Sequence, residues 1–271
     1  MKGKLRIVLT VILGAVFLVS SGLMLRQYLG DREVEGTYQE ALELALAAPA
    51  AELAAAPTMA AVTEPLWAPA PVEEADPHME ELSRLDLAAL RQVTPDVIGW
   101  IRIPDTKIDY PFLQGEDNEY YLTHTWEGEK NAAGSIFLEC MNSGDLTDFN
   151  TILYGHNMNS GAMFAGLRKY TSQNFFEAHP YVYLLTDQGV WRWEIFSAYK
   201  APVESHTYGL SFRQEETKEY FIAKALQESQ IDAGVAPEIT DRVLTLSTCS
   251  GAGYTNRWVV HARLKMVELP K

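Results

Sequence analysis

Short runs of β-branched, aromatic and aliphatic residues, separated by turn residues, recur from about residue 97 to the end of this 271-residue chain. In one run, Trp191, Trp193 and Ile195 alternate with Arg192 and Glu194, as expected for a half-buried strand whose successive side chains face opposite sides. About eight such runs occur: IGWIRI, KIDYPFL, GSIFLE, NTILYG, YVYLLT, WRWEIFSAY, DRVLTLST and RWVVHARLKMVEL. Because no long strand–helix–strand rhythm joins them, they favour a closed or nearly closed mixed β-barrel over a doubly wound sheet.

Two helices are predicted at the edge of this mainly β fold. Leucines recur at roughly helical spacing in MEELSRLDLAALRQV, residues 79–93, and Thr94-Pro95 ends the pattern. Residues 211–230 carry large apolar side chains on one helical face, between the sixth and seventh strand-like runs. The fold class is therefore mainly β with peripheral helices, one of them N-terminal and one inserted before the seventh strand.

An apolar run covers residues 5–25, with a charge only at its edge. About 20 apolar residues match the hydrocarbon thickness of a bilayer, so residues 1–26 are predicted to be a cytoplasmic N-terminus and transmembrane signal-anchor. Lys2, Lys4 and Arg6 precede or begin the run, which predicts a cytoplasmic N-terminus and an extracellular remainder. A cleaved signal peptide is the alternative, although the run is longer than the usual signal core.

The chain after this run divides into two parts by composition. Residues 27–78 are rich in alanine, proline and glutamate, which predicts an extended extracellular spacer with little more than transient helix. Residues 79–271 are predicted to form the folded domain. The expected location is a single-pass protein in the cell membrane, with the folded domain outside.

Charge and cysteine content exclude several classes of protein. The net charge of -14 leaves no basic stripe to neutralise phosphates, so nucleic acid is not an expected partner. The two cysteines, Cys140 and Cys249, can form neither a disulfide framework nor a four-cysteine zinc site, and a core of this size does not need a disulfide between them. Because no CxxC, HExxH or glycine-rich phosphate loop occurs, no metal or cofactor is predicted.

Two segments place reactive side chains at the ends of predicted strands. NTILYGHNM brings His156 to a strand end, and TLSTCSGAG brings Cys249 to another, with Arg257 eight positions later. A cationic neighbour favours the reactive thiolate of a cysteine, and a histidine can protonate a leaving amine. An arginine stays protonated and can bind an oxyanion or a substrate backbone. These three residues are the predicted catalytic groups.

Structural roles are the alternative for each such residue. A lone cysteine in a strand is usually a small buried hydrophobe, and Cys140 in GSIFLECMNSG fits that description. Arg257 alone would be a solvated strand end. The remaining histidines are interpreted as structural or as spacer and turn residues: His78, His124, His179, His206 and His261.

At these residues the chain resembles a sortase, and the class B branch in particular. The resemblance covers residues 79–267 and rests on TPDVIGWIRIPDTKIDYPFLQGEDNEYYLTH, GSIFLE, NTILYGHNM and TLSTC with its trailing arginine. It implies an eight-stranded sortase barrel with a helical insertion before the cysteine-bearing strand. By position, His156, Cys249 and Arg257 match the family's catalytic trio.

The resemblance also implies a substrate and a reaction. Asn118, Leu122, Ser247 and Thr248 match positions that line the groove for the sorting signal. Sortases are thiol-protease-type enzymes that cut a C-terminal sorting motif of secreted proteins after threonine. They then join the acyl group to an amine, here of a cell-wall precursor or a pilin lysine, which anchors surface proteins in Gram-positive cells. Ser250 stands where some relatives carry an acidic residue, so substrate preference does not carry over.

Two other functions fit the same sequence. A cysteine endopeptidase would use the same residues with water as the acceptor. A binding module on a stalk would need Cys249 only as a structural residue, and an inert Cys249 would favour it.

Overall fold

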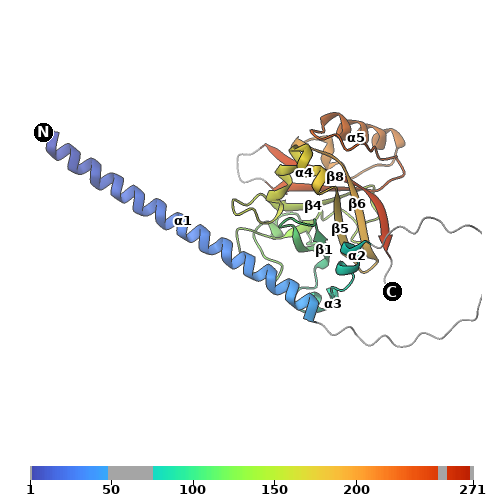
Figure 1. Ribbon diagram of the computed structural model, residues 1–271, viewed down its shortest axis with the longest axis horizontal. Helices are drawn as coiled ribbons and strands as arrows, with labels where there is room; N and C mark the ends of the chain where they lie inside the picture. The colour runs from blue at the N-terminus through green and yellow to red at the C-terminus, as the bar shows by residue number, and fades with distance from the viewer. Residues whose placement is uncertain (1, 48–75, 250–254, 269–271) are drawn as a thin grey trace, which may run out of the picture. The chain divides into compact units, whose positions relative to one another are not determined.

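The computed structural model describes residues 2–47, 76–249 and 255–268 (Figure 1). The chain divides into two compact units, Met1–Glu40 and Ala41–Lys271. The described residues of the first unit, 2–40, belong to helix α1 (Lys2–Ala47), and the second unit contains the end of that helix and the strands described below.

The described residues contradict the predicted transmembrane anchor and the single-pass membrane location that was inferred from it. No helix among them combines the length and the apolar character needed to cross a bilayer.

The segment interpreted as a spacer begins as helix, because α1 continues to Ala47. Ala41 and Ala45 are buried within the second unit, and the Ala45 carbonyl accepts a hydrogen bond from the backbone N–H of Asp86. Small side chains permit such close packing, which the alanine-rich composition did not reveal. Residues 48–75, the rest of that spacer, lie outside the described part of the chain.

The single helix predicted over residues 79–93 is two short helices. Helix α2 covers Pro77–Leu82 and helix α3 covers Leu87–Val93. The chain turns between them because Asp86 takes an extended conformation and its Oδ1 accepts hydrogen bonds from the first amides of α3, at 2.8 and 3.2 Å. The leucines thus share a buried face without sharing one helix.

Eight strands close into a barrel, as predicted. They are β1 (Val97–Arg102), β2 (Asp109–Leu113), β3 (Ile136–Leu138), β4 (Asn150–His156), β5 (Tyr181–Thr186), β6 (Gly189–Pro202), β7 (Val243–Cys249) and β8 (Asn256–Glu268). Their order around the barrel is β1-β2-β3-β4-β7-β8-β6-β5. The barrel is mixed because β2–β3 and β4–β7 pair in parallel while the other pairs are antiparallel.

The alternation predicted for β6 holds from Trp191 to Ile195. Trp191, Trp193 and Ile195 are buried, and Trp193 and Ile195 are fully enclosed. Phe196 is also buried although it follows Ile195 directly. The register of β6 against β8 shifts between Ile195 and Ser197. This irregularity in the pairing allows the successive side chains of Ile195 and Phe196 both to be buried.

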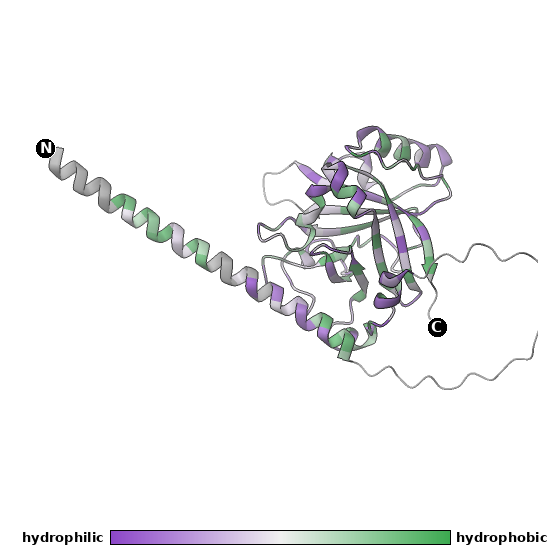
Figure 2. Ribbon diagram, viewed as in Figure 1, coloured by the Kyte–Doolittle hydropathy of each residue, from purple (hydrophilic) through white to green (hydrophobic). Residues whose placement is uncertain are grey.

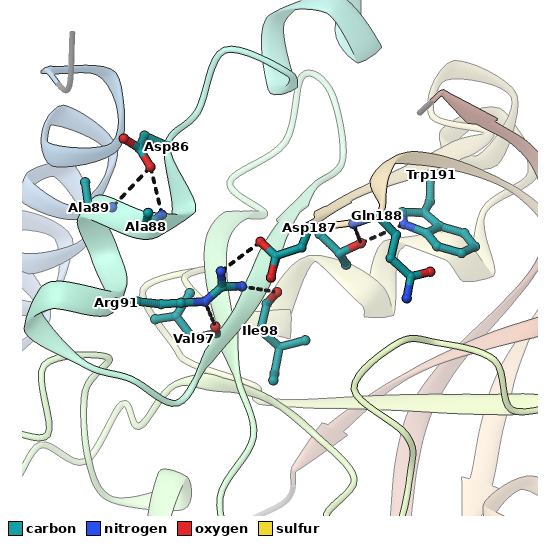
Figure 3. A network of polar contacts seen from close by, with 10 residues as sticks. Asp86, Ala88, Ala89, Arg91, Val97, Ile98, Asp187, Gln188 and Trp191 are labelled. Carbon is teal, nitrogen blue, oxygen red and sulfur yellow. Dashed lines mark hydrogen bonds and ion pairs between the residues drawn. The ribbon is translucent and has the colours of Figure 1, made fainter. Parts of the chain in front are cut away.

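Polar contacts of one arginine fix helix α3 to the barrel (Figure 3). The Arg91 guanidinium donates to the carbonyls of Val97 and Ile98, at 2.7 and 3.2 Å, and to Asp187 Oδ1 at 2.8 Å. One side chain therefore ties α3 both to β1 and to the turn between β5 and β6.

The helical insertion is present but begins later than predicted. Helix α5 covers Glu215–Glu228, carries hydrophobic and hydrophilic residues along its length (Figure 2), and packs on β6. The short helices that the sequence pattern did not predict are η1 (Tyr120–Leu122), η2 (Phe164–Thr171), α4 (Gln173–Ala178) and η3 (His206–Tyr208).

Candidate active site

Strands β4 and β7 bring the predicted histidine and cysteine to the same edge of the barrel. They pair in parallel over their whole length, from Asn150 opposite Val243 to His156 opposite Cys249. Parallel strands end at the same edge, so His156 and Cys249 are neighbours at the ends of their strands. Ser250 and the Gly251–Gly253 loop lie outside the described residues.

The His156 imidazole is held by the backbone of η1. Its Nε2 lies 2.7 Å from the carbonyl oxygen of Leu122. A carbonyl can only accept, so Nε2 carries the hydrogen of this bond. Nδ1 is therefore the ring nitrogen left to exchange a proton with a substrate or a thiol.

Arg257 lies at the start of β8, beside the end of the cysteine strand. Val259 pairs with Ser247, and the Trp258 N–H donates to Thr248 Oγ1 at 3.0 Å. Arg257 lies two positions beyond Val259, on the same side of this last pair as Cys249, which lies two positions beyond Ser247. On its other side Arg257 pairs with Ala201 of β6. The three predicted catalytic residues therefore occupy neighbouring positions on β4, β7 and β8.

The four residues predicted to bind substrate do not form one group. Leu122 reaches the site through the carbonyl that holds His156. Ser247 and Thr248 precede Cys249 on β7, and both are buried. Asn118 is instead engaged in a turn, because its amide donates to Glu139 Oε1 at 2.8 Å and accepts from the Cys140 N–H at 2.9 Å.

Tyr208 is a residue near the site that sequence reasoning missed. Its hydroxyl lies 3.0 Å from Ser247 Oγ, and its ring stacks on Tyr154 at 6.4 Å between centroids. Tyr154 and Ser247 each precede a predicted catalytic residue by two positions, which places Tyr208 over the strand faces that lead to the site. A single aromatic residue in an irregular segment carries no periodic signal that could have identified it.

Cys140 is a free thiol in a different environment. It follows β3 and is half-buried rather than enclosed, and its Sγ donates to Glu139 Oε1 at 3.4 Å. Burial and the adjacent Glu139 carboxylate raise the pKa of the Cys140 thiol, so it stays protonated near neutral pH. These features do not suit a nucleophile.

A cavity of about 580 Å³ lies beside Cys140 and η1. Its lining is mainly acidic or amide-bearing: Asp96, Gln114, Gly115, Glu116, Asp117, Tyr120, Cys140 and Asn142. None of the seven predicted site residues is in this lining. Over the described residues, moreover, no three histidine, cysteine or carboxylate side chains gather closely enough to hold a metal ion.

The other histidines have structural surroundings. His261 is fully enclosed, and its burial lowers its pKa to about 3, so it is neutral. Burial also lowers the pKa of His206. His124 stacks on Tyr120, with 4.0 Å between the ring centroids, and His179 follows the end of α4. His78, assigned to the spacer from the sequence, lies in α2.

Comparisons with known proteins agree with this fold. Residues 101–265 match the family model for the sortase domain. Sortase B of Listeria monocytogenes is 42% identical over 169 residues, which cover 61% of this chain and 68% of that protein. Sortase B of Staphylococcus aureus is 33% identical over 189 residues, which cover 69% and 77%.

Solved structures of the same kind superpose well on this chain. A Staphylococcus aureus sortase B–substrate complex has a TM-score of 0.64 and 32% identity, and the match covers 72% of this chain and 88% of that one. Sortase B from Bacillus anthracis in complex with AAEK1 has a TM-score of 0.70 and 30% identity, with 88% and 98% covered.

The chain belongs to the sortase family, whose members are cysteine transpeptidases. Within it, the relatives and solved structures agree on the class B branch, so the protein is a class B sortase and an enzyme. This excludes the interpretation as a binding module.

Proposed function

We propose that this enzyme cleaves a C-terminal sorting motif of secreted proteins after threonine and transfers the acyl group to an amine of a cell-wall precursor or a pilin lysine. The observation that carries the proposal is the parallel register that sets His156 opposite Cys249. The sortase B–substrate complex of Staphylococcus aureus, similar in fold, supports a peptide as the substrate class.

In the proposed first step, the Cys249 thiolate attacks the carbonyl carbon of the threonine. The tetrahedral intermediate collapses, the carbon–nitrogen bond breaks, and the protonated His156 gives its Nδ1 proton to the leaving amine. The product is a thioester between Cys249 and the threonine acyl group. Because the Leu122 carbonyl holds Nε2, the ring keeps one orientation through proton transfer.

In the second step, the acceptor amine attacks the thioester and Cys249 leaves as thiolate. The amine loses a proton to His156, which restores the starting state. The Arg257 guanidinium is the proposed donor to the oxyanion in both steps, because it keeps its charge at neutral pH. Asn118, Leu122, Ser247 and Thr248 remain the proposed lining of the peptide groove.

The test is acyl-enzyme formation in the full chain, measured by intact-mass spectrometry with a library of threonine-containing peptides. We expect Cys249→Ala to abolish the thioester and Cys140→Ala to retain most activity. His156→Ala and Arg257→Ala should each lower the rate by about 100-fold or more. His124→Ala and Lys265→Ala are matched controls that should turn over at nearly the wild-type rate.

A working Cys249→Ala variant together with a dead Cys140→Ala variant would refute the assignment of the nucleophile. Near-wild-type turnover of the His156 or Arg257 variant would remove that residue from the mechanism. Product analysis with and without added triglycine separates transpeptidation from hydrolysis, since only the transpeptidase gives a peptide extended by the amine.

A further inference from the structure

Five buried polar residues gather on the face of β4 and β7 that leads to the active site. They come from four strands and η3: Asn150, Tyr199, Thr207, Thr245 and His261. None exceeds 2% exposure. We call them the polar ring.

The polar ring closes on itself through hydrogen bonds. Thr245 Oγ1 lies 2.6 Å from Asn150 Oδ1 and 2.9 Å from His261 Nδ1. The Tyr199 hydroxyl lies 2.9 Å from His261 Nε2 and 2.8 Å from Thr207 Oγ1. The Asn150 amide donates to the Thr207 carbonyl at 3.2 Å, which completes the circuit.

Donor and acceptor chemistry assigns one direction to every bond in the ring. The Asn150 amide oxygen can only accept, so the Thr245 hydroxyl donates its one hydrogen to that oxygen. Thr245 Oγ1 must therefore accept the hydrogen bond from His261 Nδ1–H. Burial lowers the pKa of His261 to about 3, so the ring is neutral; with its hydrogen on Nδ1, its Nε2 has a lone pair and accepts from the Tyr199 hydroxyl. Tyr199 in turn accepts from the hydroxyl of Thr207. Burial also raises the pKa of Tyr199, which keeps that hydroxyl protonated.

This arrangement allows only one register between the strands. Sliding β7 by one residue against β4 or β8 would turn Thr245 to the opposite face, so Asn150 Oδ1 and His261 Nδ1 would lose their hydrogen bonds to Thr245. Unpaired polar groups in a dry interior are costly, because no water replaces the lost bonds. The register that the ring selects is the one in which Thr245 pairs with His261 and His156 pairs with Cys249.

We propose that the polar ring is a positioning device for the cysteine strand. Thr245 and His261 hold β7 so that position 249, four residues or about 13 Å further along, lies opposite His156. None of the five residues touches the reacting atoms, so they are positioning residues. The inference rests on the proposed catalytic pair.

The test is a Thr245→Val substitution, which keeps the shape and removes the hydroxyl. Thr151→Val is the matched control, because Thr151 is equally buried on the adjacent β4 and its hydroxyl has no hydrogen-bond partner among the described residues. Both are made in the full chain with Cys140→Ala, so that Cys249 is the thiol that remains. Iodoacetamide alkylation of this thiol is followed against pH, alongside acyl-enzyme formation.

We expect Thr245→Val to lower kcat about tenfold with KM nearly unchanged, because a small misplacement of reacting groups is costly. The midpoint of the alkylation pH profile should shift by about half a unit or more. Thr245→Ser should restore both values, and Thr151→Val should change neither. Tyr199→Phe removes one hydroxyl of the polar ring and should lower kcat by about threefold. This variant replaces Thr245→Val as the test if Thr245→Val does not fold.

A folded Thr245→Val variant with wild-type kcat and an unshifted alkylation profile would overturn the proposal, even if its melting temperature fell. For Tyr199→Phe, unchanged kcat would have the same meaning. Failure of the proposed function is a separate result, since it would appear as thioester formation by Cys249→Ala.

Discussion

Acid should destabilise this protein in the pH range where His261 titrates in the unfolded chain. The imidazole is fully enclosed among aromatic rings, at 5.3 Å from both Tyr199 and Phe221 between centroids. Burial, and secondarily the nearby His206, lowers its pKa from 6.5 to about 3. In the polar ring, moreover, Nε2 must accept a hydrogen bond, which protonation would abolish.

The sign and size follow from proton binding in the two states. Below pH 6.5, His261 is protonated in the unfolded chain but stays neutral in the folded protein. Unfolding therefore takes up a proton and becomes more favourable as pH falls. The contribution of His261 is fully present above pH 6.5 and is lost progressively down to about pH 3. Between pH 7 and pH 5 the loss is about 2 kcal/mol, from about 1.36 kcal/mol per pH unit over the 1.5 units below 6.5.

The assay is urea unfolding followed by circular dichroism at pH 7 and pH 5, for the wild type and for His261→Gln. Glutamine offers a donor and an acceptor but does not titrate. The wild type should lose about 2 kcal/mol more than the variant over this interval. His206, whose pKa is also lowered, is present in both proteins and cancels in the difference. Equal losses in the two proteins would show that folded His261 accepts a proton near neutral pH, which would refute both its neutrality and the bond directions of the ring.

Two further predictions concern packing and charge. Gly155→Ala should destabilise the fold by about 2 kcal/mol in urea unfolding, because the new Cβ would clash with Ile136 Cδ1 and lie 2.9 Å from the Phe164 ring. Wild-type stability of that variant would show that the neighbouring side chains move freely. Asp76→Asn should cost about 3 kcal/mol, since the amide still caps α2 but leaves Arg192, 11% exposed, without its 3.1 Å ion pair to Asp76. Glu80→Gln, at a 61%-exposed ion pair, is the matched control and should cost less than about 0.5 kcal/mol; equal costs would contradict the importance of burial.

The strands and the barrel could be predicted from the sequence because their signal is local. Alternation of apolar and polar residues reports which face of a strand is buried, and β5 was predicted at its observed bounds. His156 and Cys249 were found for a related reason, since a polar reactive residue directly after an apolar run falls at a strand end. The comparisons support the family but leave the roles of these residues to experiment.

What sequence reasoning missed depends on contacts between distant segments. The break between α2 and α3 comes from one aspartate whose capping bonds outweigh the leucine spacing around it. The polar ring could not be predicted from the sequence. Thr245 and His261 lie inside apolar runs, where a single polar residue does not indicate a hydrogen-bond network. Only the register of four strands brings their donors and acceptors together. The contacts of Asn118 were likewise not predictable, since its side chain hydrogen-bonds to Glu139 and Cys140, about twenty residues away in the sequence.

The strand order explains why the polar ring includes a residue from outside the barrel strands. Strand β8 lies between β6 and β7 in the barrel, so no hairpin can join β6 to β7, and the chain leaves the barrel after Pro202 and returns at Val243. That excursion contains η3 and α5, and η3 brings Thr207 into the ring and Tyr208 against Ser247. The crossover that the topology requires therefore supplies contacts that hold the cysteine strand in register. A change in η3 should alter catalysis through β7 even where it touches no substrate.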